Sequence, residues 1–113
     1  MRGAMRSRTR NEHCTQMTLP EFKSSLARTR PPAGVPAAVV ALWWAAKDDW
    51  KKAHQIVMDE SSKECAWVHA YLHRAEGDLE NAGYWYRRAG KPVTQGRLQA
   101  EWDAIAGALL SRP

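Results

Sequence analysis

The chain has 113 residues, of which 44% are hydrophobic and 26% charged, and it contains six tryptophans. These values exclude a wholly disordered chain, and the length suits one core rather than two. The formal net charge of +5 lies in residues 1–30, which carry seven basic and two acidic residues, whereas residues 31–113 carry ten of each. Because a phosphate-binding surface should belong to the folded domain, this distribution argues against nucleic acid as the main partner.

Three further classes of protein are disfavoured by the sequence. The longest apolar run, Val35 to Ala46, has twelve residues, well short of the roughly 18 residues of a membrane span. The N-terminal arginines precede no apolar segment, so a secretory signal is not indicated, although a transit peptide would have a similar Arg- and Ser-rich composition. Cys14 and Cys65 form neither a metal-ligand pair nor a disulfide framework. We therefore expect a cytoplasmic protein without membrane contact and without a cofactor.

Residues 1–16 lack hydrophobic periodicity and contain few apolar side chains. This composition is typical of disorder, and we expect a disordered basic tail. Either Met1 or Met17 could be the start of translation.

Residues 17–35 are predicted to form a lead-in helix and a linker. Thr18 precedes Glu21 by three positions, as in a capping box, and a proline in the first turn is tolerated because its missing N–H needs no partner there. This pattern predicts a short helix from about Leu19 to Ala27. The following residues 28–36 contain three prolines and a glycine, which predicts an extended linker.

Residues 36–113 are expected to form a helical-hairpin domain, in which helical segments alternate with tight turns. Core helices are predicted over residues 37–47, 50–60, 65–76 and 79–89, and a last helix within residues 95–112. The first of these is apolar on nearly every face, which predicts the most buried helix. The last carries one apolar stripe and is expected to cap the exposed end of the preceding hairpin.

An internal repeat relates the two halves of this domain. A shift of 29 residues aligns DDWKKAHQIV with GDLENAGYWY, so that Trp50 matches Leu79 and Ala53 matches Ala82. Each half is thus a helix, a turn carrying aspartate and a second helix. Repeated hairpins of this kind stack on one another. The sequence therefore predicts an all-α fold of two antiparallel helical hairpins, with an N-terminal lead-in helix and a C-terminal capping helix.

The second hairpin resembles the tetratricopeptide repeat. The family's order of small, turn-glycine, small, aromatic, small and proline positions is followed by Ala70, Gly77, Ala82, Tyr86, Ala89 and Pro92. The interval of 29 residues is shorter than the family's interval of about 34, and His73 replaces an aromatic residue. The resemblance implies a helical-hairpin fold and a groove that binds a peptide. Residues 42–110 are also similar to a group of small uncharacterised helical proteins, which implies no activity.

His69, His73 and Glu76 follow the spacing i, i+4, i+7 and share one face of the predicted helix. Two imidazoles one turn apart, with a carboxylate, can bind a transition metal, but this motif alone makes His69 and His73 weak metal candidates. The alternatives are a structural role with hydrogen-bonded rings, or a place in a ligand pocket. We expect partial burial at an edge between helices, with a hydrogen-bond partner drawn from the set His54, Glu76, Tyr84 and Tyr86.

A second group of candidates could bind a partner. Tyr84, Arg87 and Arg88 lie on the predicted outer side of the fourth core helix, and guanidinium groups bind carboxylates bidentately. An acidic peptide would suit this surface, to which we also assign Trp67, Tyr71 and Arg74. The alternative is that these arginines are only solvated.

These observations favour a non-catalytic protein-interaction or self-associating structural module, with a protein or acidic peptide, or a second copy, as partner. The competing hypothesis is a small metal-binding protein or enzyme that uses His54, His69, His73 and Glu76. No Ser/His/Asp set is recognisable, and Cys65, one turn before His69, is the only candidate thiolate in the predicted domain.

Overall fold

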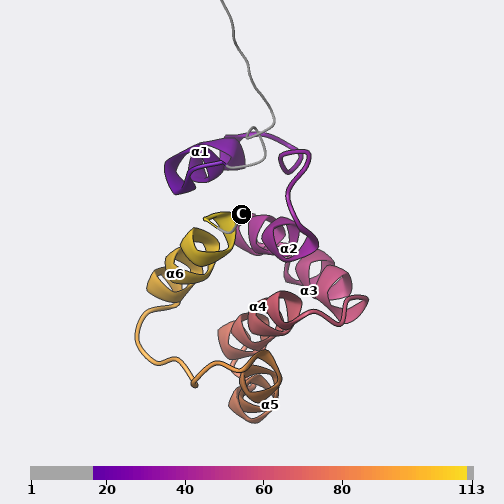
Figure 1. Cartoon of the computed structure of the whole chain (residues 1–113), viewed down its shortest axis with the longest axis vertical. Helices are drawn as coiled ribbons and strands as arrows, with labels where there is room; N and C mark the ends of the chain where they lie inside the picture. The colour runs from indigo at the N-terminus through magenta and orange to yellow at the C-terminus, as the bar shows by residue number, and fades with distance from the viewer. Residues whose placement is uncertain (1–16, 112–113) are drawn as a thin grey trace, which may run out of the picture.

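The computed structural model describes residues 17–111, which fold into α-helices joined by short connections (Figure 1). The elements are α1 (Leu19–Ser24), the 3-10 turn η3 (Ser25–Ala27), α2 (Ala37–Ala46), α3 (Trp50–Met58), α4 (Lys63–Ala75), α5 (Leu79–Ala89) and α6 (Leu98–Leu110). No strand occurs in this part of the chain. The predicted all-α fold is confirmed, and the basic tail predicted over residues 1–16 lies outside the described residues.

The lead-in helix begins as its capping box predicts. The Thr18 side chain accepts from the Glu21 N–H at 3.2 Å, and the Glu21 carboxylate accepts from the Thr18 N–H at 2.9 Å. Phe22 is fully buried and stacks on Trp102 of α6, with ring centroids 5.6 Å apart. This segment therefore packs on the core.

The turns inside the two hairpins share one geometry, which bears out the 29-residue repeat. Asp49 caps α3 and Asp78 caps α5, each accepting from an N–H three residues later. In both turns the capping aspartate also donates its own N–H to the carbonyl five residues earlier, at 2.9 Å. The residue before the cap has a left-handed backbone, with φ of 64° at Asp48 and 89° at Gly77. Both turns thus reverse the chain in the same way.

The helices stack in chain order from α2 to α5. Helix α2 packs on α3 and α4, α3 packs on α4, and α4 packs on α5. The connection after α5 returns the chain to the side of α2, where α6 lies (Figure 1). The expected arrangement of two antiparallel hairpins is therefore confirmed.

The most buried helix is α4, and the expectation that it would be α2 was wrong. Neighbours α2, α3, α5 and α6 all pack on α4, and the buried residues run from Cys65 to His73 with only Trp67 half-buried. Helix α2 was expected to be the most buried because it is apolar on nearly every face. Burial, however, depends on how many neighbouring helices surround a helix. Because α4 lies in the centre, even its histidines His69 and His73 are buried.

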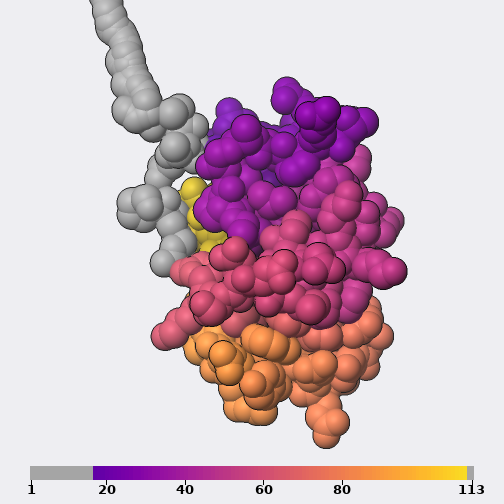
Figure 2. Space-filling model, turned by 90° about the vertical axis from the view of Figure 1, so that its right-hand side faces the viewer, coloured from indigo at the N-terminus to yellow at the C-terminus, as the bar shows by residue number. Residues whose placement is uncertain are grey.

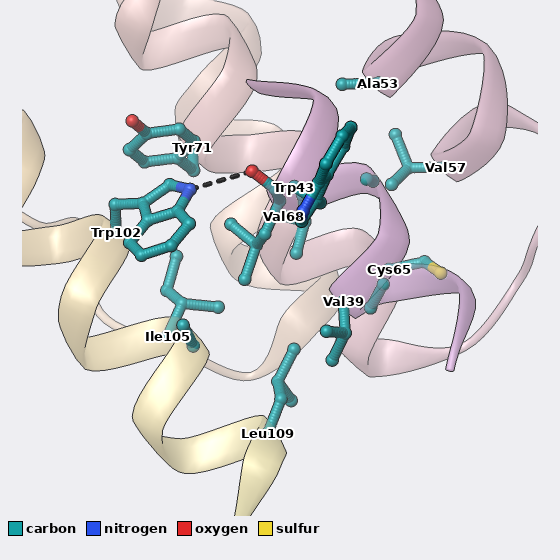
Figure 3. Packing of buried hydrophobic residues seen from close by; sticks show 14 of the residues in the cluster. Val39, Trp43, Ala53, Val57, Cys65, Val68, Tyr71, Trp102, Ile105 and Leu109 are labelled. Carbon is teal, nitrogen blue, oxygen red and sulfur yellow. Dashed lines mark hydrogen bonds between the residues drawn. The ribbon is translucent and has the colours of Figure 1, made fainter. Parts of the chain in front are cut away.

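The apolar stripe of α6 suggested that this helix covers the exposed end of the second hairpin, but it does not. It packs instead on α1, α2 and α4, and the indole N–H of Trp102 donates to the Leu42 carbonyl at 2.9 Å (Figure 3). Ile105 and Leu109 enter the same core. The stripe packs on the first helix of each hairpin, α2 and α4. The outer side of α5 is therefore left without this cover.

A buried ion pair ties α6 to the second hairpin. The Glu101 carboxylate, 4% exposed, accepts from Arg74 Nη1 at 2.8 Å and from the Tyr86 hydroxyl at 2.5 Å. Arg74 also donates to the Gly96 carbonyl in the connection before α6. Burial and the neighbouring carboxylate raise the pKa of Tyr86, so its hydroxyl stays a donor.

Within residues 17–111, no helix combines the length and apolarity needed to cross a bilayer.

We predict that Arg74→Ala lowers the free energy of unfolding by about 3 kcal/mol, because it leaves the buried Glu101 carboxylate without its cation. Urea denaturation measures this loss. The matched control is Lys23→Ala, which breaks an ion pair with Asp103 whose side chains are 44% and 36% exposed and should cost about 1 kcal/mol or less. Equal losses in the two variants would contradict the role given to Arg74.

Gly77→Ala is expected to lower the free energy of unfolding by about 1 kcal/mol, since a φ of 89° is unfavourable for a residue with a Cβ. The control is Gly107→Ala in the interior of α6, where a Cβ would meet no atom within 4 Å. That substitution should raise stability by roughly 0.5–1 kcal/mol. Thermal denaturation should show a lower midpoint for Gly77→Ala and a higher midpoint for Gly107→Ala than for the wild type.

Candidate functional site

Three histidines from two helices meet between the hairpins. His69 and His73 lie one turn apart on α4, and His54 reaches them from α3. One ring nitrogen of each lies within 4.8 Å of those of the other two. The structure thus brings His54 to His69 and His73, which the sequence placed together on one helix face.

Hydrogen bonds join the rings to two of the partners that we expected. His69 Nε2 lies 3.0 Å from His54 Nε2, and His73 Nδ1 lies 2.8 Å from a Glu76 carboxylate oxygen. The two tyrosines bond elsewhere, Tyr86 to Glu101 and Tyr84 to Arg88. The four residues His54, His69, His73 and Glu76 are called the histidine cluster below.

The rings are more deeply buried than the sequence suggested. His69 is 4% exposed and His73 6% exposed, whereas His54 is half-buried. The expected partial burial of the first two was wrong because helices pack on α4 from both sides. His54, on α3, supplies the more open edge of the cluster.

Two tryptophans form walls of the histidine cluster. Trp50 stacks on His54 with centroids 4.6 Å apart, and Trp85 stacks on His69 at 3.9 Å. Trp50 also donates its indole N–H to the Leu72 carbonyl at 2.7 Å, which fixes α3 on α4. Neither tryptophan was among the site residues predicted from the sequence. The i, i+4 spacing of Trp50 and His54 could have indicated the first stack, but the second joins α5 to α4 and has no local signal.

Burial and neighbouring charges lower the pKa values of His54 and His69. Burial, followed by the charges of His54 and His73, lowers the pKa of His69 to about 4. Burial and then His73 lower the pKa of His54, while the Glu76 carboxylate opposes that shift. The outer nitrogen of His69, Nδ1, is buried and has no hydrogen-bond partner. At neutral pH these two rings are therefore neutral and able to act as ligands or proton acceptors.

The residues assigned to a partner surface divide into two sets. Tyr71 is buried, Trp67 is half-buried beneath the Lys91 ammonium, and Arg74 is held by Glu101. None of these three offers an open face for an acidic peptide. The structure therefore separates them from the remaining candidates.

Tyr84, Arg87 and Arg88 do lie together on the exposed side of α5. Arg88 Nη1 donates to the Tyr84 hydroxyl at 3.2 Å, and its guanidinium lies over the Tyr84 and Trp85 rings. A shallow hollow beside Tyr84 and Arg87 is bordered also by acidic residues at the start of α5. The surface is thus charged with both signs rather than uniformly basic.

Cys65 lies in the first turn of α4, and its thiol is buried in the hydrophobic core (Figure 3). Burial raises its pKa, with a smaller opposing effect from the hydrogen bond to Ser62. The thiol is therefore protonated at neutral pH, and the thiolate considered from the sequence is not favoured.

Comparisons of this chain with protein-family models, with curated proteins and with solved structures find no match. Function is therefore inferred from the geometry of the described residues.

We predict that the free energy of unfolding falls by about 3 kcal/mol as the pH falls from about 6.5 to about 4, because His69 is protonated in the unfolded chain but not in the folded one. When folding lowers the pKa of a histidine, the folded state is stabilised at pH values above the pKa of the unfolded chain. This stabilisation is lost as the pH falls towards the folded pKa. Urea denaturation across this range, with a chelator present, measures it.

The control compares His69→Gln with His13→Gln. Carboxylate titrations contribute to both profiles and cancel in the difference. Only His69→Gln should flatten the profile, and equal slopes in the two variants would contradict the assignment.

Proposed function

We propose that this chain is a non-catalytic interaction module that associates with a second copy of itself through the outer face of α5. The supporting observation is that α5 packs on α4 alone among the helices described, apart from the Tyr86 bond to α6. Its repeat counterpart α3 packs between α2 and α4. In a stacked array the second helix of each hairpin is covered by the next unit, and α5 has no such unit in residues 17–111.

The repeat register identifies the uncovered positions. Helix α3 contacts the next hairpin through Trp50 and His54, and the positions 29 residues later are Leu79 and Gly83. Leu79 is 68% exposed, the highest value among the exposed large hydrophobic side chains of residues 17–111. A Cβ at Gly83 would meet only the end of the Arg87 side chain, at 3.7 Å. An exposed leucine beside a glycine suits the close approach of another helix.

The charges on this face favour a second copy as the occupant. Helix α5 forms the end of the molecule away from α1 (Figure 2). Leu79 and Gly83 are one turn apart, as are Glu80 and Tyr84, and the two pairs lie side by side along α5. Acidic Glu80 lies near the start of the helix, and the arginines lie in its last turn. Two α5 helices in antiparallel contact would place the acidic end of each beside the basic end of the other.

Tyrosine and arginine also suit the centre and rim of an interface. Both residue types are enriched where proteins bind one another. The Arg88 side chain is already held against Tyr84, so less conformational entropy is lost on association. An acidic peptide is less favoured, because Arg74 is engaged with Glu101.

Leu79→Glu is expected to weaken dimerisation of the full chain by about tenfold or more, equivalent to about 1.4 kcal/mol, because it places a charge in the apolar centre of the contact. Sedimentation velocity over a wide concentration range measures the dimer dissociation constant. The matched control is Met58→Glu, since Met58 is 55% exposed at the end of α3 and should leave the constant unchanged.

A charge exchange tests the antiparallel register. Glu80→Arg should weaken the dimer, and adding Arg87→Glu should restore it, because the opposite charges then meet again. A wild-type chain that stays monomeric at every concentration, or equal effects of the Leu79 and Met58 variants, would contradict the proposal.

A further inference from the structure

We propose that His54, His69 and His73 form a binding site for one divalent transition-metal ion of the zinc class, with their Nε2 atoms as ligands. This site is independent of self-association through α5. The three rings offer nitrogen atoms within 4.8 Å of one another. Imidazole nitrogens bind zinc at about 2.0–2.1 Å, so tetrahedral ligands lie about 3.3 Å apart, and the two Nε2 atoms of His54 and His69 are at 3.0 Å.

The contact between His54 and His69 is one that a metal ion can replace. In this contact one Nε2 atom carries a proton and donates it to the lone pair of the other Nε2 atom. A divalent ion at this position takes the place of that proton, which moves to Nδ1 of the ring that carried it, so that both Nε2 atoms offer a lone pair to the ion and both rings stay neutral. Small rotations of the rings suffice, because the distance between the atoms is already close to that of two ligands on one ion.

Glu76 acts in this site as a positioning residue rather than as the third ligand. Its carboxylate accepts from His73 Nδ1–H at 2.8 Å, so the remaining nitrogen of His73, Nε2, carries the lone pair. Carboxylate, histidine and metal in this order are a common arrangement in zinc sites, where the carboxylate fixes the tautomer and the ring orientation. The sequence motif had suggested direct ligation by Glu76.

His69 lacks an equivalent outer partner. Its Nδ1 is buried without a hydrogen bond, and its ring is held by stacking on Trp85 at 3.9 Å and on His73 at 4.9 Å. Ligation through Nε2 places a proton on that unpartnered Nδ1, which opposes binding. We therefore infer a reversible site, weaker than a structural zinc site whose ligands are all oriented by hydrogen bonds.

The ion would keep one exchangeable position. Three protein nitrogens leave the fourth tetrahedral position open, as in zinc sites that hold water or a small ligand. His54 is the least buried ring of the three, so the open position and the entry route lie on its side. Imidazole ligands suit Zn²⁺, Co²⁺, Ni²⁺ and Cu²⁺ rather than Mg²⁺ or Ca²⁺.

The test titrates the full chain, prepared without a histidine tag, with Zn²⁺ by calorimetry and with Co²⁺ by visible absorption. One ion per chain is expected, together with partial quenching of tryptophan fluorescence by Co²⁺, because Trp50 and Trp85 stack on ligand rings. Mg²⁺ should give no signal.

Variants locate the ion. His54→Ala and His73→Ala should abolish stoichiometric binding, Glu76→Gln should weaken it by about tenfold or more, and the matched control His13→Ala should bind as the wild type does. Circular dichroism verifies folding. Because His54 is half-buried, its variant tests the site even if substitutions of the buried rings unfold the protein. Fewer than one ion per chain, or binding that survives His54→Ala, would overturn the proposal.

Discussion

The packing of four helices around α4 is the constraint on which the rest of the structure depends. Helices α2, α3, α5 and α6 all contact α4, so the polar side chains on its packed faces are largely shielded from bulk water and need partners from within the fold. His69 finds His54 on α3, His73 finds Glu76 at the end of its own helix, and Arg74 finds Glu101 on α6. Each of these contacts to another helix also fixes where that neighbour lies.

The polar groups around α4 form two networks of different character. In the network of Arg74, Glu101 and Tyr86, charge is balanced and the carboxylate accepts from both partners, as expected of a structural element. In the histidine cluster a buried nitrogen of His69 has no partner, and two neutral rings face each other. Stability alone does not account for such an arrangement, because a buried polar atom without a hydrogen bond is unfavourable. The facing Nε2 atoms of His54 and His69, rather than the unpartnered Nδ1, are the reason to look for a ligand at the histidines.

Local patterns predicted the elements well, and long-range contacts explain where prediction failed. The capping box at Thr18, the capping aspartates and the repeated turn depend on residues within one or two helical turns, and the structure has all of them. The position of α6 and the burial of Arg74 depend on residues more than twenty positions apart. The apolar stripe of α6 showed that it must be covered but carried no information about which surface would cover it.

The sequence by itself determined the helices, their order, the 29-residue hairpin repeat and the pairing of His69 with His73 on one helix face, because hydrogen bonds and side-chain spacing within a helix are set by neighbours in the chain. Only the tertiary structure decided that Trp85 closes the histidine cluster and that α6 leaves the outer face of α5 uncovered. Both outcomes follow from competition among apolar surfaces for the same partners. That competition is settled by the shape of the whole core, which no local pattern encodes.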